Sequence, residues 1–255
     1  MPLRVGFDLD GTVADMYTAL RREAVSLFGE DVLATTTAAP STPQSPRNDA
    51  SPQKTASSTD DSKPKSEDDQ TTTLAMQELQ LTARQQAQLW DHVKKIENFW
   101  TTLPELEAGI IARIAKNVIE RRWEVIFLTT RPATVGELVQ LQSQRWLEAH
   151  GMPYPSVFVV QRSRGKIADA LALDAFVDDR PENCLDIAVE SKAKVILVWH
   201  GDPKDVPSGA KRLGVQPVQA IGEAMTLLEK LDDIRNKPTL LRSIKRVFGQ
   251  SDPDA

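Results

Sequence analysis

The sequence has one cysteine, no long apolar run and no excess of basic residues. Cys184 is the only cysteine among 255 residues, so an intrachain disulfide is excluded and a reducing compartment is expected. No stretch approaches the roughly 18 apolar residues of a membrane-spanning helix. Acidic residues outnumber basic ones 36 to 31, which gives no electrostatic footprint for nucleic acid or an anionic membrane. We therefore expect a cytoplasmic protein that binds neither a nucleic-acid polymer nor a membrane.

One segment also lacks the residues from which a core is built. Residues 34–73 contain no Val, Ile, Leu, Met or aromatic residue. Such a segment buries too little apolar surface to offset the entropy that ordering would cost. We predict that it is disordered.

The remaining chain alternates between strand-like and helix-like patterns. Apolar runs predict strands at 3–7, 124–129, 157–160, 175–177 and 195–199. Helical spacing and capping residues predict helices at 15–28, 104–120, 134–150 and 181–190, with one or two more between 74 and 100. Strands separated by helices predict an α/β fold of three layers, in which helices cover both faces of a parallel sheet. Ligands bind at the carboxyl ends of the strands in such sheets.

An acidic motif follows the first predicted strand. Asp8 and Asp10 stand two residues apart, followed by Gly11 and Thr12. Both carboxylates can reach one site where the chain turns out of the strand, and the glycine allows a ligand to approach the backbone closely. The amides that follow can form an anion-binding nest. A plain turn with an aspartate cap is the simpler alternative for the motif taken alone.

Further polar residues follow the later strands. Thr129 and Thr130 end the second strand and could hydrogen-bond a phosphate, although strand ends and helix caps use the same residues. Lys166 begins a helical pattern and could hold a phosphate as a point charge, although a solvated lysine is the simpler interpretation. Asp178 and Asp179 end a buried strand, where a divalent cation such as Mg²⁺ would relieve the repulsion between them.

The order of these four motifs resembles the haloacid dehalogenase (HAD) superfamily of phosphohydrolases, over about residues 3–32 and 95–205. The resemblance implies that Asp8 is the nucleophile that forms an aspartyl-phosphate intermediate. It implies that Asp10 is the general acid and then the general base, with its backbone carbonyl on the metal. An acid at position 10 favours phosphatase chemistry over dehalogenation.

The resemblance also implies a cofactor and a domain plan. The cofactor is Mg²⁺. The implied metal ligands are Asp8, Asp10, Asp178 and Asp179, and the implied phosphate-binding residues are Gly11, Thr12, Thr129 (or Thr130) and Lys166. The plan is a HAD-like Rossmannoid core formed by 1–14 and 104–234, with a small helical cap at 15–103 inserted after the first strand. A tail at 235–255 carries a short amphipathic helix.

The cap sequence points to one subfamily. Residues 97–104 read ENFWTTLP and are similar to the segment that returns from cap to core in 5′(3′)-deoxyribonucleotidases. This resemblance implies a nucleoside monophosphate substrate, deoxyribonucleotides first, with Tyr17, Trp100 and Arg131 as candidate substrate contacts. Packing is the simpler role for each of the two aromatic rings. The chain departs from the subfamily in its 34–73 insertion and in Arg131, which stands where a smaller residue is expected.

Two alternatives remain open from the sequence. The substrate could be a sugar phosphate or another small phosphomonoester, since the chemistry of the motifs is the same. The chain could also be a non-catalytic HAD scaffold that binds a partner, although a scaffold has no chemical need for the motif residues.

Overall fold

The computed structural model describes residues 2–30, 79 and 81–236. The predictions for 34–73 and for the C-terminal amphipathic helix lie outside the described residues. The strands are β1 (Arg4–Asp8), β2 (Glu124–Thr129), β3 (Ser156–Val159), β4 (Ala175–Asp178), β5 (Lys194–Val198) and β6 (Gln216–Val218). The α-helices are α1 (Met16–Phe28), α4 (Ala83–Val93), α5 (Ile110–Arg121), α6 (Val139–Ala149), α7 (Arg164–Ala170), α8 (Pro181–Glu190), α9 (Ser208–Arg212) and α10 (Ile221–Asn236). Two short 3-10 helices are η2 (Phe99–Thr101) and η3 (Pro203–Asp205).

The strands form one parallel sheet in the order β3-β2-β1-β4-β5-β6. This confirms the predicted α/β fold, and each predicted strand lies within one residue of its expected bounds. The sixth strand was not predicted, because β6 has three residues and a proline in its middle. The chain builds β1, β2 and β3 outward in one direction and then returns to place β4 on the other side of β1. The sheet therefore has a switch point between β1 and β4, where ligands bind in open α/β sheets.

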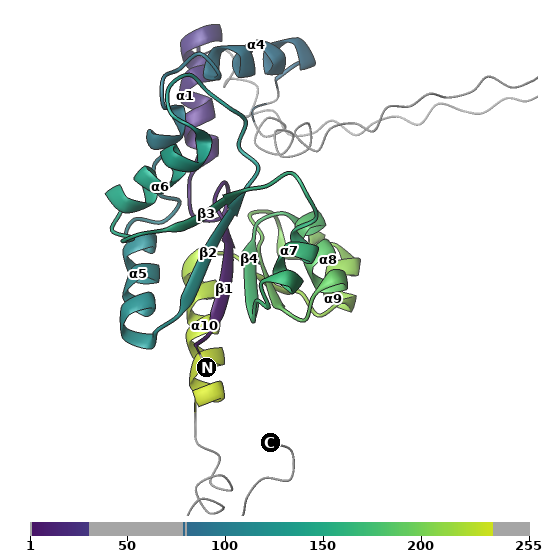
Figure 1. The fold of residues 1–255 in the computed structure, drawn as a ribbon. Helices are drawn as coiled ribbons and strands as arrows, with labels where there is room; N and C mark the ends of the chain where they lie inside the picture. The colour runs from purple at the N-terminus through teal and green to yellow at the C-terminus, as the bar shows by residue number, and fades with distance from the viewer. Residues whose placement is uncertain (1, 31–78, 80, 237–255) are drawn as a thin grey trace, which may run out of the picture.

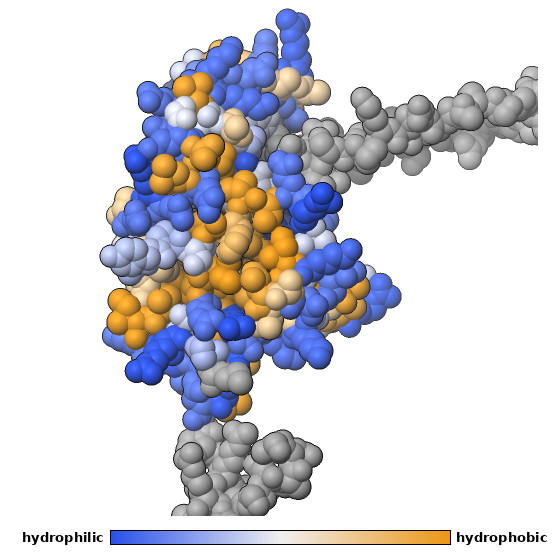
Figure 2. All heavy atoms as spheres, in the orientation of Figure 1, coloured by the Kyte–Doolittle hydropathy of each residue, from blue (hydrophilic) through white to orange (hydrophobic). Residues whose placement is uncertain are grey.

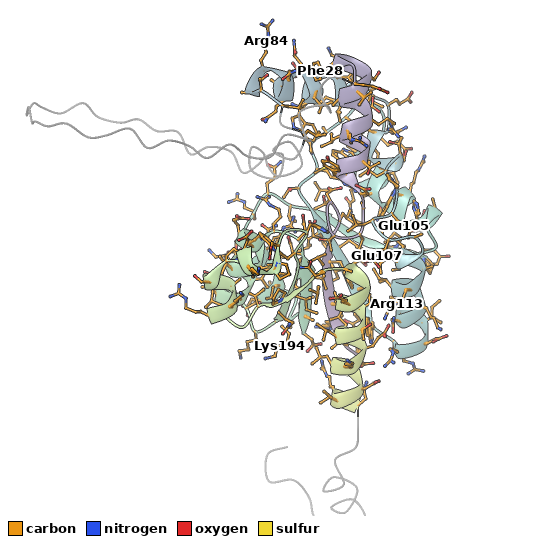
Figure 3. The ribbon with its side chains drawn as sticks, turned by 180° about the vertical axis from the view of Figure 1, so that it is seen from behind. Phe28, Arg84, Glu105, Glu107, Arg113 and Lys194 are labelled. Atoms are coloured by element: carbon orange, nitrogen blue, oxygen red, sulfur yellow. The ribbon has the colours of Figure 1, made fainter. Side chains whose placement is uncertain are left out.

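Helices cover both faces of the sheet (Figure 1). Helices α5, α6 and α10 pack on one face, and α7, α8 and α9 pack on the other. The alternation within β4 shows how a strand serves both layers, since Ala175 and Val177 join the first core and Phe176 joins the second. Helices α5 and α10 lie side by side (Figure 3), and Arg113 of α5 donates to Glu229 of α10 at 3.1 and 3.0 Å. Helices α1 and α4 lie beyond the carboxyl ends of the strands (Figure 1).

Local capping explains the helix that follows β1. Asp15 accepts a hydrogen bond from the Thr18 backbone N–H at 2.9 Å, and Gly29 ends the helix with a φ of 83°. The predicted helix at 15–28 is thereby confirmed. Helix α4 starts with a capping box between Thr82 and Gln85. It covers only part of the predicted 74–100 region, of which residues 74–78 and 80 lie outside the described residues.

Two predicted helix starts were wrong. Helix α5 begins at Ile110 rather than Pro104, because Glu105 pairs with Ala14 in a β-bridge and its carboxylate accepts from the Gly109 and Ile111 N–H groups. Helix α6 begins at Val139 rather than Thr134. The Glu137 N–H donates to the Asn98 side chain at 2.8 Å, which holds residues 135–137 in a bend against the chain before η2. Both causes are contacts between segments far apart in sequence.

Strand β3 forms one edge of the sheet and carries exposed apolar side chains. Phe158 is 45% exposed and Val159 is 38% exposed. Figure 2 shows apolar side chains gathered in the middle of the face in view.

Among the helices of the described residues, none combines the length and the apolar content that crossing a bilayer requires.

Candidate active site

Three strands end in a polar side chain at the same edge of the sheet. Asp8 is the last residue of β1, Thr129 the last of β2 and Asp178 the last of β4. The register places Phe7 beside Val177 and Asp8 beside Leu128, so parallel pairing brings the three ends together. All three side chains are buried, with exposures of 4%, 0% and 0%. The site lies at the switch point of the sheet.

Asp8, Asp178 and Asp179 form a compact acidic cluster. One carboxylate oxygen of each lies within 4.8 Å of the other two. Burial, together with the charges of Asp178 and Asp10, raises the pKa of Asp8 to about 7 against the opposing charge of Arg164. Burial and the charges of Asp8 and Asp178 also raise the pKa of Asp179 well above its ordinary value. The buried carboxylates therefore repel one another, and a bound cation would stabilise the cluster.

Arg164 supplies part of the missing positive charge. Its Nη1 lies 2.6 Å from Asp8 Oδ1 and 2.5 Å from Asp178 Oδ2, and the side chain is 4% exposed. Asp178 is held further by the Arg180 backbone N–H at 2.9 Å and by Asn183 Nδ2 at 3.1 Å. One buried guanidinium thus bridges two of the three carboxylates and fixes their relative position.

Sequence reasoning missed Arg164 and chose Lys166. Ser163 caps α7 by accepting from the Lys166 N–H at 3.2 Å, which makes Arg164 the first helical residue. Residues two positions apart on a helix point about 200° away from one another, so Arg164 and Lys166 cannot both face the acidic cluster. Lys166 is exposed, and its ammonium group forms no ion pair with a described residue. The position of the cap was the signal that could have distinguished the two basic residues.

The start of α7 is anchored against α8. Ser163 Oγ donates to Asp186 at 2.9 Å, and the Gly165 N–H donates to the same carboxylate at 2.8 Å. A Cβ atom at Gly165 would lie 2.4 Å from the Asp186 carbonyl oxygen. Only glycine allows this approach without a backbone shift, and the approach fixes the position of Arg164.

The loop after β1 closes over Asp179. Gly11 has a φ of +83°, and a Cβ there would lie 2.2 Å from Asp179 Oδ2. Thr12 is buried, and its hydroxyl donates to Asp179 Oδ1 at 3.3 Å. His200, which follows β5, has Nε2 2.7 Å from the Gly11 carbonyl oxygen. The predicted phosphate-binding residues Gly11 and Thr12 thus border the acidic cluster.

Asp10 lies beside the cluster in a second charged pair. Arg131 Nε lies 2.9 and 3.0 Å from the two Asp10 oxygens, and Nη2 lies 2.7 Å from Oδ1. The Thr129 hydroxyl donates to Asp10 Oδ2 at 3.3 Å. Thr130 is partly buried and follows this strand end.

Two expected substrate contacts are corrected by burial. Arg131 is 3% exposed, because its side chain turns inward to Asp10. Trp100 is 0% exposed and packs in the core against Phe99 and Trp90. Both side chains are already engaged by other residues, Arg131 by Asp10 and Trp100 by the Pro132 carbonyl. Tyr17 is partly buried at the start of α1, next to the core, and its contact with a substrate stays a prediction.

The acidic cluster fits a hard divalent cation. Mg²⁺ prefers carboxylate oxygens at about 2.1 Å and so holds its ligands about 3 to 4.2 Å apart. One oxygen of each carboxylate lies within 4.8 Å of the other two, close enough for one ion to draw all three to that spacing. Burial and neighbouring negative charge raise the pKa values of Asp8 and Asp179, and a cation would offset both effects. Asp8, Asp178 and Asp179 are the residues that would hold the ion. The Asp10 side chain is engaged with Arg131, which leaves its backbone carbonyl as the ligand that the resemblance implies.

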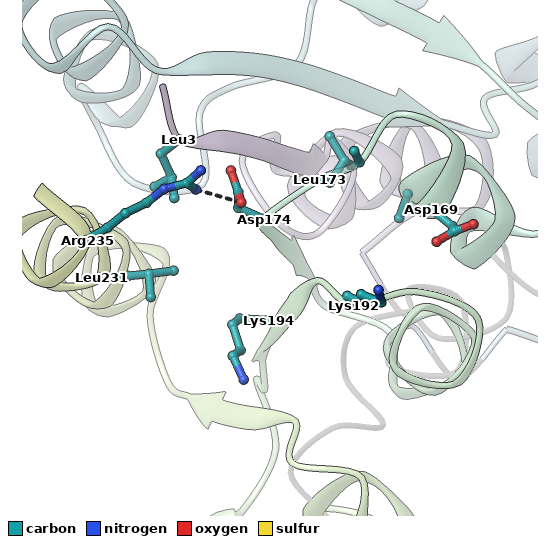
Figure 4. Close-up of a pocket in the computed structure, with 10 residues that line it drawn as sticks. Leu3, Asp169, Leu173, Asp174, Lys192, Lys194, Leu231 and Arg235 are labelled. Carbon is teal, nitrogen blue, oxygen red and sulfur yellow. Dashed lines mark ion pairs between the residues drawn. The ribbon is translucent and has the colours of Figure 1, made fainter. Parts of the chain in front are cut away.

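A separate cavity lies at the opposite end of the strands from the acidic cluster (Figure 4). Its volume is about 500 Å³. Leu3, just before β1, and Lys194, the first residue of β5, line it together with Asp174 and Arg235, which form an ion pair. These residues stand at the amino ends of the strands, so the cavity is not part of the acidic site.

Comparison with known proteins yields structural similarities only. No protein-family model and no curated protein matches the sequence. A predicted phosphatase from Clostridium acetobutylicum has 12% identity and a TM-score of 0.47, with 90% of this chain and 99% of that chain covered. A haloacid dehalogenase-like family hydrolase from Streptococcus pneumoniae has 10% identity and a TM-score of 0.46, with coverage of 89% and 98%. The function is therefore inferred from the side chains at the site.

Proposed function

We propose that this chain is a Mg²⁺-dependent phosphomonoesterase of the HAD type. The observation that supports this most is the meeting of Asp8, Asp178 and Asp179 around Arg164, with Asp10 beside them. Two carboxylates two residues apart at a strand end can divide nucleophilic attack and proton transfer between them. A bound Mg²⁺ would supply positive charge that lets a phosphate dianion approach the carboxylates.

The reaction that we propose has two steps. In the first, an Asp8 oxygen attacks the phosphorus, the bond from phosphorus to the leaving oxygen breaks, and Asp10 gives that oxygen its proton. In the second, Asp10 takes a proton from a water molecule as the water attacks the phosphorus of the aspartyl phosphate. The bond between phosphorus and Asp8 then breaks, which releases inorganic phosphate and regenerates the Asp8 carboxylate and the protonated Asp10 carboxyl group.

Other residues would bind and orient the phosphoryl group. Arg164 holds Asp8 in place and offers a fixed positive charge beside the attacked phosphorus, the role that the resemblance gave to Lys166. The Thr129 hydroxyl and the backbone amides that follow Asp10 are suitable donors to phosphate oxygens. Helices α1 and α4 lie beyond this end of the sheet (Figure 1), where a cap at 15–103 over a core of 1–14 and 104–234 would exclude water.

The substrate that we propose is a nucleoside monophosphate, and its deoxy form first. The support is the 97–104 segment and its resemblance to 5′(3′)-deoxyribonucleotidases. The burial of Trp100 and Arg131 removes two of the three side chains expected to contact the base or sugar, so the preference rests on Tyr17 and the cap. A sugar phosphate is the alternative that the same chemistry would serve.

Phosphate release from a panel of substrates tests the proposal. The panel contains deoxy- and ribonucleoside monophosphates and sugar phosphates, assayed with Mg²⁺ and with EDTA, and the matched control is Asp8→Asn. We expect Mg²⁺-dependent release from nucleotides that Asp8→Asn abolishes. Release mainly from sugar phosphates would retain the chemistry and reject the nucleotidase proposal. Release from no member of the panel, or release that Asp8→Asn leaves intact, would reject the phosphomonoesterase proposal and favour a scaffold.

A further inference from the structure

The pair formed by Asp10 and Arg131 is a buried ion pair beside the acidic cluster. The Arg131 side chain is 0% exposed and that of Asp10 is 5% exposed. Three N–H···O contacts of 2.7 to 3.0 Å join the guanidinium to both carboxylate oxygens. Such a pair fixes the plane of the carboxylate as well as its position, because the guanidinium is planar and its donors are rigid.

Arg131 is itself held by side chains from two further elements. Its Nη1 donates to Ser143 Oγ of α6 at 2.9 Å. Its guanidinium carbon lies 4.9 Å from the centroid of the Trp100 ring, which belongs to η2. The Trp100 ring is fixed in turn by a 2.9 Å hydrogen bond from Nε1 to the Pro132 carbonyl. The orientation of Asp10 therefore depends on side chains from α6 and η2.

From this geometry we propose that Arg131 is the positioning residue for Asp10, with Ser143 acting only through Arg131. This inference rests on the proposed function, in which Asp10 protonates the leaving oxygen. The Arg131 guanidinium is already bound by Asp10 and Ser143, so we expect its effect on the reaction to pass through Asp10. The Thr129 hydroxyl contacts one Asp10 oxygen, but a single contact leaves the carboxylate free to rotate.

This role predicts that the rate lost when Asp10 is misplaced depends on the leaving group of the substrate. An alkyl phosphate, such as a nucleoside monophosphate, loses a strongly basic oxygen and needs the proton from Asp10. The p-nitrophenolate ion is weakly basic and leaves without that proton. A misplaced Asp10 should therefore slow the hydrolysis of alkyl phosphates much more than that of p-nitrophenyl phosphate.

The test uses Arg131→Lys in the full chain. Lysine keeps the charge but cannot bind both carboxylate oxygens in a fork. We expect kcat/KM for the best alkyl phosphate of the panel to fall by about tenfold or more, within the range that general acid catalysis contributes. We expect a fall of less than about threefold for p-nitrophenyl phosphate, since its leaving group needs no acid. Ser143→Ala should lower kcat/KM for the two substrates in the same pattern, but by smaller factors. Arg131→Lys should add little to Asp10→Asn, because both changes act on one proton transfer.

Arg113→Lys is the matched control. Arg113 also binds a carboxylate through two donors, that of Glu229, but between α5 and α10. We expect it to change neither the rate nor the dependence on the leaving group. Equal loss of activity toward both substrates in Arg131→Lys, or no loss at all, would overturn the positioning role.

A crystal structure of Arg131→Lys gives a readout that does not depend on activity. The Asp10 carboxylate should rotate away from its wild-type orientation while Asp8 and Asp178 stay in place. An unmoved Asp10 would overturn the inference. If the wild-type protein releases no phosphate from any substrate, the proposed function fails, and the orientation of Asp10 in this crystal structure still decides whether Arg131 positions it.

Discussion

Replacement of Asp8 by asparagine should stabilise the metal-free protein while it abolishes turnover. Asn fills nearly the same volume and can still accept a hydrogen bond from Arg164, but it carries no charge. In the metal-free wild-type protein, an ionised Asp8 is buried beside Asp178, Asp179 and Asp10, and Arg164 balances only part of that negative charge. The substitution removes one of the repelling charges.

The size of the effect follows from the pKa of Asp8. An acid whose pKa is raised on folding keeps its proton in the folded state after the unfolded state has lost it, so stability falls as pH rises between the two values. For Asp8 these values are 3.8 and about 7, which correspond to about 4 kcal/mol at higher pH as an upper limit. Relaxation of the site and entry of water reduce this penalty, and we expect a gain of about 1–3 kcal/mol for Asp8→Asn. The melting temperature should then rise by about 2–10 °C.

Thermal unfolding in EDTA measures this gain. Wild type and Asp8→Asn are compared from pH 4 to pH 8.5, with Asp91→Asn as a control at an exposed aspartate. The difference in melting temperature should be near zero at about pH 4, grow up to about pH 7 and stay constant above it. With Mg²⁺ present the difference should shrink or reverse, because only the wild type has the complete cluster. A lower melting temperature for Asp8→Asn at pH 8, or a difference that does not change with pH, would refute the reasoning.

Four further predictions concern single residues. Asp179→Asn should weaken Mg²⁺ binding by about tenfold or more, measured by calorimetry, since it removes one of three anionic ligands; unchanged affinity would exclude the cluster as the metal site. Lys166→Ala should leave kcat/KM within about twofold of wild type, whereas Gly165→Ala should lower stability by about 1–3 kcal/mol because its Cβ meets the Asp186 backbone; thermal unfolding and phosphate release distinguish the two variants. Burial raises the pKa of Glu229, but hydrogen bonds from Arg113 and Asn117 outweigh it and lower the net value. Glu229→Gln should therefore cost stability at neutral pH and lose this effect only as pH falls through the lowered pKa, and an equal cost at pH 3 and pH 7 would contradict this.

The sequence alone determined the strands and the ends of several helices. Five strands were placed within one residue, because apolar runs bounded by turn residues are local signals. Asp15, Gly29 and Pro181 mark the ends of α1 and α8 through contacts within one helical turn. The sequence also placed Asp8, Asp10, Asp178 and Asp179 at strand ends, and the parallel sheet brings such ends to one edge.

Only the tertiary structure decided which basic residues face the acidic ones. Arg164 rather than Lys166 reaches Asp8, because the approach of Gly165 to α8 fixes the position of α7. Arginine is a residue type that often contacts substrates, but the orientation of the Arg131 side chain is set by Asp10, Ser143 and Trp100.

The starts of α5 and α6 were decided in the same way. Glu105 pairs with Ala14, and Asn98 holds the Glu137 N–H. Each of these contacts joins residues at least 39 positions apart. A pattern read over one or two helical turns contains no information about such contacts, so the sequence predicted where the chemistry lies and the fold decided which side chains take part in it.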